Sequence, residues 1–131
     1  MNSIKNTRNY NMKKCLSKTN NFGFILYQTN LKHNLEALSE YEFKKEISKL
    51  KEKTKPNLGD ILILTTESED IIKYAGIIST KQNQSLEIWH EEFGKYEISS
   101  LETIIEKYSQ FRPGEWEPMK IKYYESPLSK V

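Results

Sequence analysis

The sequence is poor in cysteine and histidine, and it has no long apolar run. Its one cysteine, Cys15, excludes an intramolecular disulfide and is typical of a reducing compartment. No apolar run approaches the roughly 20 residues that a bilayer-spanning helix requires. The N-terminus also lacks the apolar central region of a signal peptide. We therefore expect an intracellular, cytoplasmic protein with no membrane partner.

The signatures of several enzyme classes are missing as well. One cysteine and two separated histidines, His33 and His90, cannot supply the four ligands of a structural zinc site. A serine-hydrolase elbow, a glycine-rich phosphate loop and a dinucleotide fingerprint are absent. Cys15 falls in a segment expected to be unstructured, where a nucleophile would not be held in place. The sequence thus predicts a protein that is not an enzyme, with no catalytic residues, no metal and no cofactor.

Acidic residues are absent from the first 20 positions. Five basic residues give this stretch a charge of +5, whereas the remaining 111 residues carry 18 acidic and 15 basic groups. Its polar composition shows no periodicity, so residues 1–20 are expected to be a basic, disordered tail. Residues 21–131 are then one folded domain. The tail is either a solvated leader or a source of salt-sensitive attraction to phosphates.

Two β-branched apolar runs in the middle of the chain predict a hairpin. Residues 61–66 and 71–80 are separated by the polar turn 67–70. Gly59-Asp60 is a tight-turn dipeptide before the first run. Both runs are nearly continuously apolar instead of alternating, which indicates strands covered on both faces, as in the centre of a small barrel.

Two capping boxes predict two helices. Ser39 and Glu42 have the spacing at which each side chain bonds the backbone of the other, so a helix is expected to begin near residue 40. The same spacing recurs at Ser99 and Glu102. Apolar residues at i, i+3, i+4 and i+7 from Leu101 give the second helix one apolar face.

The remaining apolar segments predict strands. Residues 22–29 are aromatic and β-branched, and residues 86–90 and 93–98 form either one long strand or two paired strands. Residues 116–124 alternate, and Pro118 places this strand at a sheet edge. The element order favours an α+β fold with a small open β-barrel of about five or six strands and two capped flanking helices.

The element order and three short segments resemble the PUA-like superfamily, nearest the EVE and YTH-type domains. The segments are Phe24–Asn30, Gly59–Leu64 with Tyr74–Ile78, and Trp116 with Met119–Ile121. Together they span about residues 22–131. The resemblance implies a module that takes a flipped, often modified (for example methylated) base of DNA or RNA into an aromatic pocket. Such a module can serve as the recognition part of a larger restriction or modification complex.

Six residues are candidates for contacting the base: Tyr27, Thr29, Asn30, Tyr74, Trp89 and Trp116. The aromatic members fall on predicted strands, where they can stack on unpaired bases, and ordinary core burial is the alternative for each. The resemblance places Thr29 and Asn30 at a strand end that borders the pocket, where they can bond a base edge. Trp89 is the candidate stacking wall, because its strand face also carries Glu87 and Glu91.

Two other functions remain open. A non-catalytic protein-interaction or structural subunit would have this fold without a base pocket. A small metal-dependent nuclease would bring Asp60 and Glu87 together near Lys73. A basic, aromatic-bearing concavity at the Asn30 end of the barrel would favour the base reader over the interaction subunit.

Overall fold

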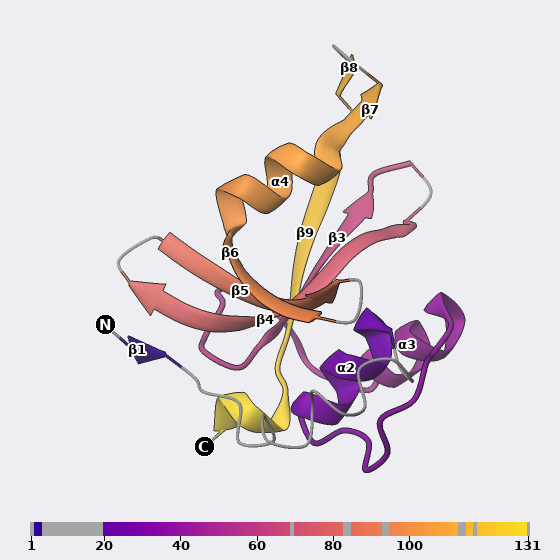
Figure 1. Cartoon of the computed structure of the whole chain (residues 1–131), viewed down its shortest axis with the longest axis vertical. Helices are drawn as coiled ribbons and strands as arrows, with labels where there is room; N and C mark the ends of the chain where they lie inside the picture. Colours follow the sequence, from indigo (N-terminus) through magenta and orange to yellow (C-terminus); the bar gives the residue numbers. More distant parts are fainter. Residues whose placement is uncertain are drawn as a thin grey trace.

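The computed structural model describes residues 2–3, 20–68, 70–82, 85–92, 95–112, 115–116 and 118–130 (Figure 1). Its helices are α2 (Asn21–Gln28), α3 (Glu40–Ile47) and α4 (Leu101–Ser109), with a short 3-10 helix, η2 (Pro127–Lys130). Its strands are β1 (Asn2–Ser3), β2 (Glu52–Lys53), β3 (Ile61–Thr66), β4 (Ile72–Gln82), β5 (Ser85–Glu92), β6 (Lys95–Ser100), β7 (Gln110–Arg112), β8 (Glu115–Trp116) and β9 (Met119–Tyr124).

The main sheet is antiparallel, in the order β2-β9-β3-β4-β5-β6, with β1 paired to β4. Strands β7 and β8 form a separate two-stranded ribbon. Over the part of the chain that the structure describes, no pairing joins β6 to β2, so the sheet is open and does not close into a barrel. The α+β class and the two capped helices are confirmed, and α2 is a third helix.

Both faces of the central strands are covered, as their continuous apolar runs predicted. All six residues of β3 are buried. Ile61 and Ile63 belong to a core that also includes residues of α2 and α3, whereas Leu62 and Leu64 belong to a second core with Ile104 of α4. Helix α4 accordingly lies on the opposite side of the sheet from α2 and α3 (Figure 1).

The strand predicted for residues 22–29 is wrong, because this segment is helix α2. The side chain of Asn20 caps the helix by accepting a hydrogen bond from the backbone N–H of Gly23 at 3.0 Å. Phe24, Ile25 and Leu26 are all fully buried. A helix surrounded by protein shows no polar face, so its sequence cannot be told from a buried strand by periodicity.

The first capping box is confirmed, and the second, predicted at Ser99 and Glu102, is wrong. Glu42 N donates to Ser39 Oγ at 3.1 Å, and Ser39 N donates to Glu42 Oε1 at 3.1 Å. At α4, Thr103 N donates instead to Ser100 Oγ at 3.3 Å. Ser99 and Ser100 both pair with β5, opposite Ile88 and Glu87, and α4 begins at Leu101, directly after Ser100.

The hairpin of β3 and β4 is confirmed, with a bulge between Leu64 and Thr65. Strands β5 and β6 pair with each other, which settles the choice between one long strand and two. Within the described pairing, β9 is an edge over residues 119–122, as Pro118 predicted, and its last two residues pair with β2.

Most of the predicted tail, residues 4–19, lies outside the described residues. At its start, Asn2 and Ser3 pair with Lys81 and Thr80 of β4. In the described part of the chain, no helix is both long and apolar enough to cross a membrane.

Candidate functional site

Strands β4 and β5 diverge along half of their length. Pairing between them covers residues 77–82 of β4, whereas β4 pairs with β3 over residues 72–77. Beyond Trp89, β5 pairs with β6 alone. Helix α2 contacts both β4 and β5 and lies close to this divergence. Residues 72–76 of β4 therefore have a strand partner on one side only.

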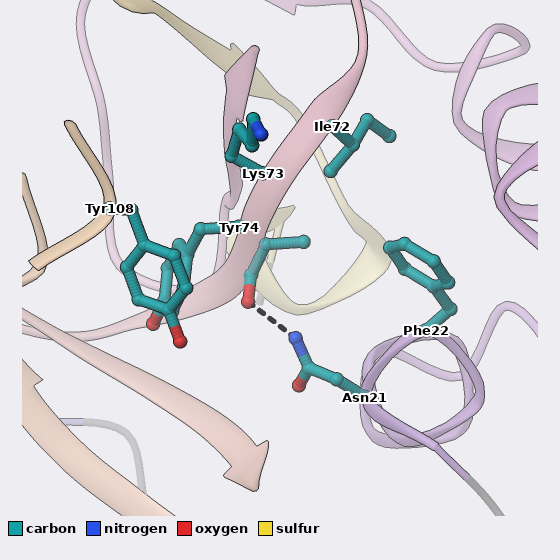
Figure 2. Close-up of a pocket in the computed structure, with 7 residues that line it drawn as sticks. Asn21, Phe22, Ile72, Lys73, Tyr74 and Tyr108 are labelled. Atoms are coloured by element: carbon teal, nitrogen blue, oxygen red, sulfur yellow. Dashed lines mark hydrogen bonds between the residues drawn. The ribbon is translucent and has the colours of Figure 1, made fainter. Parts of the chain in front are cut away.

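The side chain of Asn21 takes the place of a strand partner at this edge. Its Nδ2 donates to the carbonyl oxygen of Ala75 at 2.7 Å (Figure 2). In an antiparallel ladder the N–H and C=O of one residue point to the same side. The N–H of Ala75 therefore also points away from β3, toward the space beside Asn21.

A pocket of about 210 Å³ opens at this edge. It is lined by Asn21, Phe22, Ile72, Lys73, Tyr74, Ala75 and Tyr108. The rings of Tyr74 and Tyr108 lie on one side of β4, and Phe22 and Ile72 lie on the other (Figure 2).

The aromatic walls of the pocket are held by other rings and by a cation. The ring centroids of Tyr74 and Tyr108 are 5.1 Å apart, with an interplanar angle of 49°. Lys107 Nζ lies 5.3 Å from the centroid of the Tyr108 ring. Phe22 stacks on Phe43 of α3, with centroids 4.6 Å apart. These contacts restrict the movement of the rings. A flat ligand that stacks on them therefore loses less free energy to the ordering of side chains.

The pocket has the chemistry of a small binding site. Its volume is below the roughly 300–1,000 Å³ of sites for drug-sized ligands, so it suits a single ring system. Polar backbone groups of Ala75 and the amide of Asn21 lie beside apolar and aromatic walls, and the exposed Lys73 adds a positive charge. No histidine, cysteine or carboxylate is among its described lining residues, and the titratable side chains there are those of Lys73, Tyr74 and Tyr108.

Of the six residues predicted from sequence, Tyr74 lines this pocket. Thr29 ends α2 fully buried, and its Oγ1 donates to the carbonyl oxygen of Ile25 at 2.8 Å. Asn30 is exposed and has a positive φ of 65°, and it follows a helix instead of a strand. Tyr27 packs against the core shared by α2 and α3.

The two tryptophans are described by their backbone pairing alone. Trp89 lies opposite Ile77, the last β4 residue paired before the strands diverge, and opposite Ile98 of β6. Trp116 lies in the β7–β8 ribbon, opposite Gln110. Their side chains lie outside the described residues, so their roles as stacking walls remain predictions.

The other six lining residues were not predicted from sequence as base contacts: Asn21, Phe22, Ile72, Lys73, Ala75 and Tyr108. Asn21 and Phe22 were missed because residues 22–29 were interpreted as a strand. Tyr108 was predicted as part of the apolar face of the second helix, and it does pack against that core. No local signal indicates that its ring also meets Tyr74, a residue 34 positions earlier.

The carboxylates considered for a metal site have different surroundings. Asp60 is fully buried and paired with Lys53, whereas Glu87 is exposed and pairs across the sheet with Thr80. Lys73 lies at the opposite end of β4 from Thr80. Among residues with a described position, no group of three or more His, Cys, Asp and Glu could hold a metal ion.

Comparison of the chain with models of protein families, with curated proteins and with solved structures finds no match. The geometry of the pocket is therefore the basis for a functional proposal.

Proposed function

We propose that this chain is a non-catalytic nucleic-acid-binding module that holds one unpaired base in the pocket between β4 and α4. The observation that supports it is the tyrosine pair, Tyr74 and Tyr108, beside the polar groups of Asn21 and Ala75. Stacking surfaces with adjacent hydrogen-bonding groups are what a base taken out of its helix requires. We further propose that the module is PUA-like and that the base it recognises is modified.

The energetics of this arrangement are favourable for a single base. Unstacking a base costs a few kcal/mol, and least where it is already unpaired. Stacking on an aromatic side chain returns about 1–3 kcal/mol per base. The proposal therefore favours single strands or damaged and mismatched sites over intact duplexes.

The pocket walls also bear on the preference for a modified base. Phe22 and Ile72 form an apolar side, and Asn21 lies next to them at the polar edge of β4 (Figure 2). A base that presents its hydrogen-bonding edge to Asn21 and Ala75 brings a ring substituent against Phe22 or Ile72. A methyl group there would lose contact with water and gain about 0.8 kcal/mol.

The test is fluorescence anisotropy with labelled single- and double-stranded DNA and RNA oligonucleotides, each with and without a methylated base. Tyr108→Leu removes the ring and keeps an apolar side chain, whereas Tyr41→Leu removes a tyrosine that is 76% exposed on α3. Loss of a stacking contact of about 1–3 kcal/mol weakens binding by a factor of roughly 5 to 150. We expect that loss in Tyr108→Leu alone.

Equal affinities in the two variants would contradict a base stacked on Tyr108 in this pocket. Circular dichroism and thermal unfolding of both variants establish that a loss of binding is not a loss of fold. Binding that does not depend on methylation would contradict recognition of a modified base, but it would still support binding of an unpaired base.

One observation favours a second function, a protein-interaction subunit. Strand β6 pairs with β5 alone in the described part of the sheet, and Ile98 on this edge is 56% exposed. An open edge with an exposed apolar side chain can accept a strand from another protein. This function is supported if neither the unmodified chain nor the Tyr108→Leu variant binds an oligonucleotide although the variant folds normally.

A further inference from the structure

A second hollow lies between α3, β3 and β9, beside the turn that joins β3 to β4. Its volume is about 180 Å³, and it is lined by Lys44, Ile47, Ser48, Ile63, Thr65, Asp70, Lys122 and Tyr124. The hollow and the pocket beside Tyr74 are neighbours along the chain, because Asp70 lines the hollow and Ile72, two residues later, lines the pocket.

Three lysines converge on Asp70 at this hollow. Lys120 Nζ and Lys122 Nζ each lie 3.5 Å from the same carboxylate oxygen, Asp70 Oδ1. Lys44 Nζ donates to the backbone carbonyl of Asp70 at 2.7 Å and also pairs with Glu40 at 3.2 Å. The lysines therefore outnumber the carboxylates that they face.

The strand register explains why these lysines meet. Lys122 lies opposite Ile63 and Lys120 lies opposite Thr65, so both lysines are on the α3 side of the sheet. In α3, Lys44 shares a helix face with Ile47 and Ser48, which also line the hollow. One strand, β9, and one helix, α3, thus supply the positive charges, and the cluster does not depend on one loop.

The wall of the hollow holds a hydroxyl without a partner. Thr65 is 1% exposed, and its Oγ1 has no hydrogen-bond partner among the described residues. A buried hydroxyl that bonds to nothing costs about 1–3 kcal/mol. Such a group beside a cluster of cations indicates a ligand that accepts hydrogen bonds.

We propose that this hollow is a binding site for a phosphate group, and that the carboxylate of Asp70 acts as an internal anion that competes with the ligand for the lysines. The two contacts to Asp70 Oδ1, at 3.5 Å, are longer than the 2.7–2.9 Å of a strong charge-assisted bond. A phosphate presents several acceptor oxygens, so each ammonium group and Thr65 Oγ1 can have an oxygen of its own. Replacement of the Asp70 carboxylate by a phosphate at the lysines breaks no covalent bond.

The position of Asp70 allows this exchange. Its side chain is 51% exposed, so it can turn to solvent when a ligand takes its place. Burial raises the pKa of its carboxyl, but the charges of Lys122 and Lys120 and their hydrogen bonds together hold the pKa below its ordinary value. The lysines therefore stabilise an anion here.

This inference goes beyond the proposed function and does not require it. Two sources supply the same chemistry: a phosphodiester of a nucleic acid strand whose base enters the neighbouring pocket, or a free phosphomonoester. The first would make one ligand span the turn 67–71, and the second would make the hollow an independent site.

The experiment is an NMR titration of the ¹⁵N-labelled full chain with inorganic phosphate, at an ionic strength held constant with chloride. Asp70→Asn removes the competing charge, and it keeps the turn because Asn tolerates the positive φ of 58° at this position. Lys122→Met removes one ammonium group and keeps its apolar stem. Lys45→Met is the matched control, an exposed lysine of α3 that does not line the hollow.

We expect shifts concentrated at the hollow, tighter binding to Asp70→Asn by about tenfold, and weaker binding to Lys122→Met by about tenfold, one decade of affinity in each direction. Lys45→Met should behave as the unmodified chain. Shifts spread over all basic surfaces, or equal affinities for Lys122→Met and Lys45→Met, would overturn the phosphate site.

A second arm distinguishes the two sources. If the site takes a phosphodiester, Lys122→Met also weakens binding of a single-stranded oligonucleotide that lacks terminal phosphates. If it takes a phosphomonoester, Lys122→Met affects inorganic phosphate alone. Both results support the phosphate site. The effect of Tyr108→Leu on oligonucleotides is measured separately, so failure of the base pocket and failure of the phosphate site give different results.

Discussion

Lys53 Nζ lies 2.9 Å from Asp60 Oδ2, and this ion pair joins β2 to the turn that precedes β3. Asp60 is fully buried, and the side chain of Lys53 is only 15% exposed. The backbone N–H of Asn57 also donates to Asp60 Oδ2, at 2.7 Å. Within the described structure, Asp60 Oδ1 has no hydrogen-bond partner. The turn predicted from Gly59-Asp60 therefore depends on a buried carboxylate that has few partners.

Removal of Lys53 from this pair should be strongly destabilising. Lys53→Met leaves the Asp60 charge buried, and loss of one partner of a buried pair costs about 3–5 kcal/mol. Denaturant unfolding measures the difference, with the exposed Lys51→Met as the control. The double variant Lys53→Met/Asp60→Asn should lose less than the sum of the two single losses. A loss below about 1 kcal/mol, the range of surface pairs, would contradict a buried role.

Asn20 should be important to stability because its side chain bonds both to the first turn of α2 and to the backbone of Leu38, 18 positions away. Its Oδ1 accepts from Gly23 N at 3.0 Å and from Leu38 N at 3.1 Å, and its Nδ2 donates to Leu38 O at 2.7 Å. Asn20→Ala should lower the free energy of unfolding by about 2–3 kcal/mol, a cap plus bonds of about 1 kcal/mol each. Asn20→Asp, which keeps the acceptor and loses the donor, should lose less.

Unchanged stability in Asn20→Ala would contradict the helical assignment of residues 21–28. It would return the segment to the strand that its aromatic and β-branched residues predicted. Far-UV circular dichroism of both variants checks the helix content directly.

The start of α4 distinguishes two adjacent serines. Both serines pair with β5, but Ser100 directly precedes α4 and its Oγ accepts a hydrogen bond from Thr103 N. Ser100→Ala should therefore destabilise the protein by about 1 kcal/mol, the usual effect of losing a cap. Ser99→Ala should have a smaller effect on thermal unfolding. The reverse order would restore the capping box at Ser99 and Glu102.

Acid should weaken the contacts of Asp70. Because the folded-state pKa of this carboxyl lies below its ordinary value of 3.8, its contribution to stability is present above that pH. It is lost as the pH falls through the lower folded-state value. We expect Asp70→Asn to reduce the slope of stability against pH in this range, measured by urea unfolding between neutral pH and about pH 2, below the ordinary carboxyl range.

Glu67→Gln is the control for that slope. It removes a charge from the same turn, and no ion pair between described residues involves Glu67. Equal changes of slope in the two variants would indicate a general charge effect of the turn, not the contact of Asp70 with the lysines.

Much of the fold follows from local sequence, and the sites do not. The hairpin of β3 and β4 and the box of Ser39 and Glu42 were predictable because each is specified by neighbouring residues. Helix α2 was not, because burial on nearly all sides hides the helical period.

The pocket beside Tyr74 depends on contacts between residues far apart in the sequence. Tyr74 was predicted from its place on a strand, but Asn21 and Tyr108 reach it only because β4 and β5 diverge and α4 crosses the other face. Lys120 and Lys122 were predicted on one face of an alternating strand. That this face lies beside Asp70 follows from the pairing of β9 with β3, which joins residues more than 50 positions apart.

The most direct measurement of the central proposal is the fluorescence of a single-stranded oligonucleotide that carries one 2-aminopurine, a base whose emission is quenched by stacking. If a base enters the pocket, the unmodified chain and Tyr41→Leu should change the emission on binding, and Tyr108→Leu should not. The half-buried ring of Tyr108 is the stacking surface in question, because Tyr74, which it contacts, is only 4% exposed. The same emission with all three proteins at saturation would contradict a base held between β4 and α4.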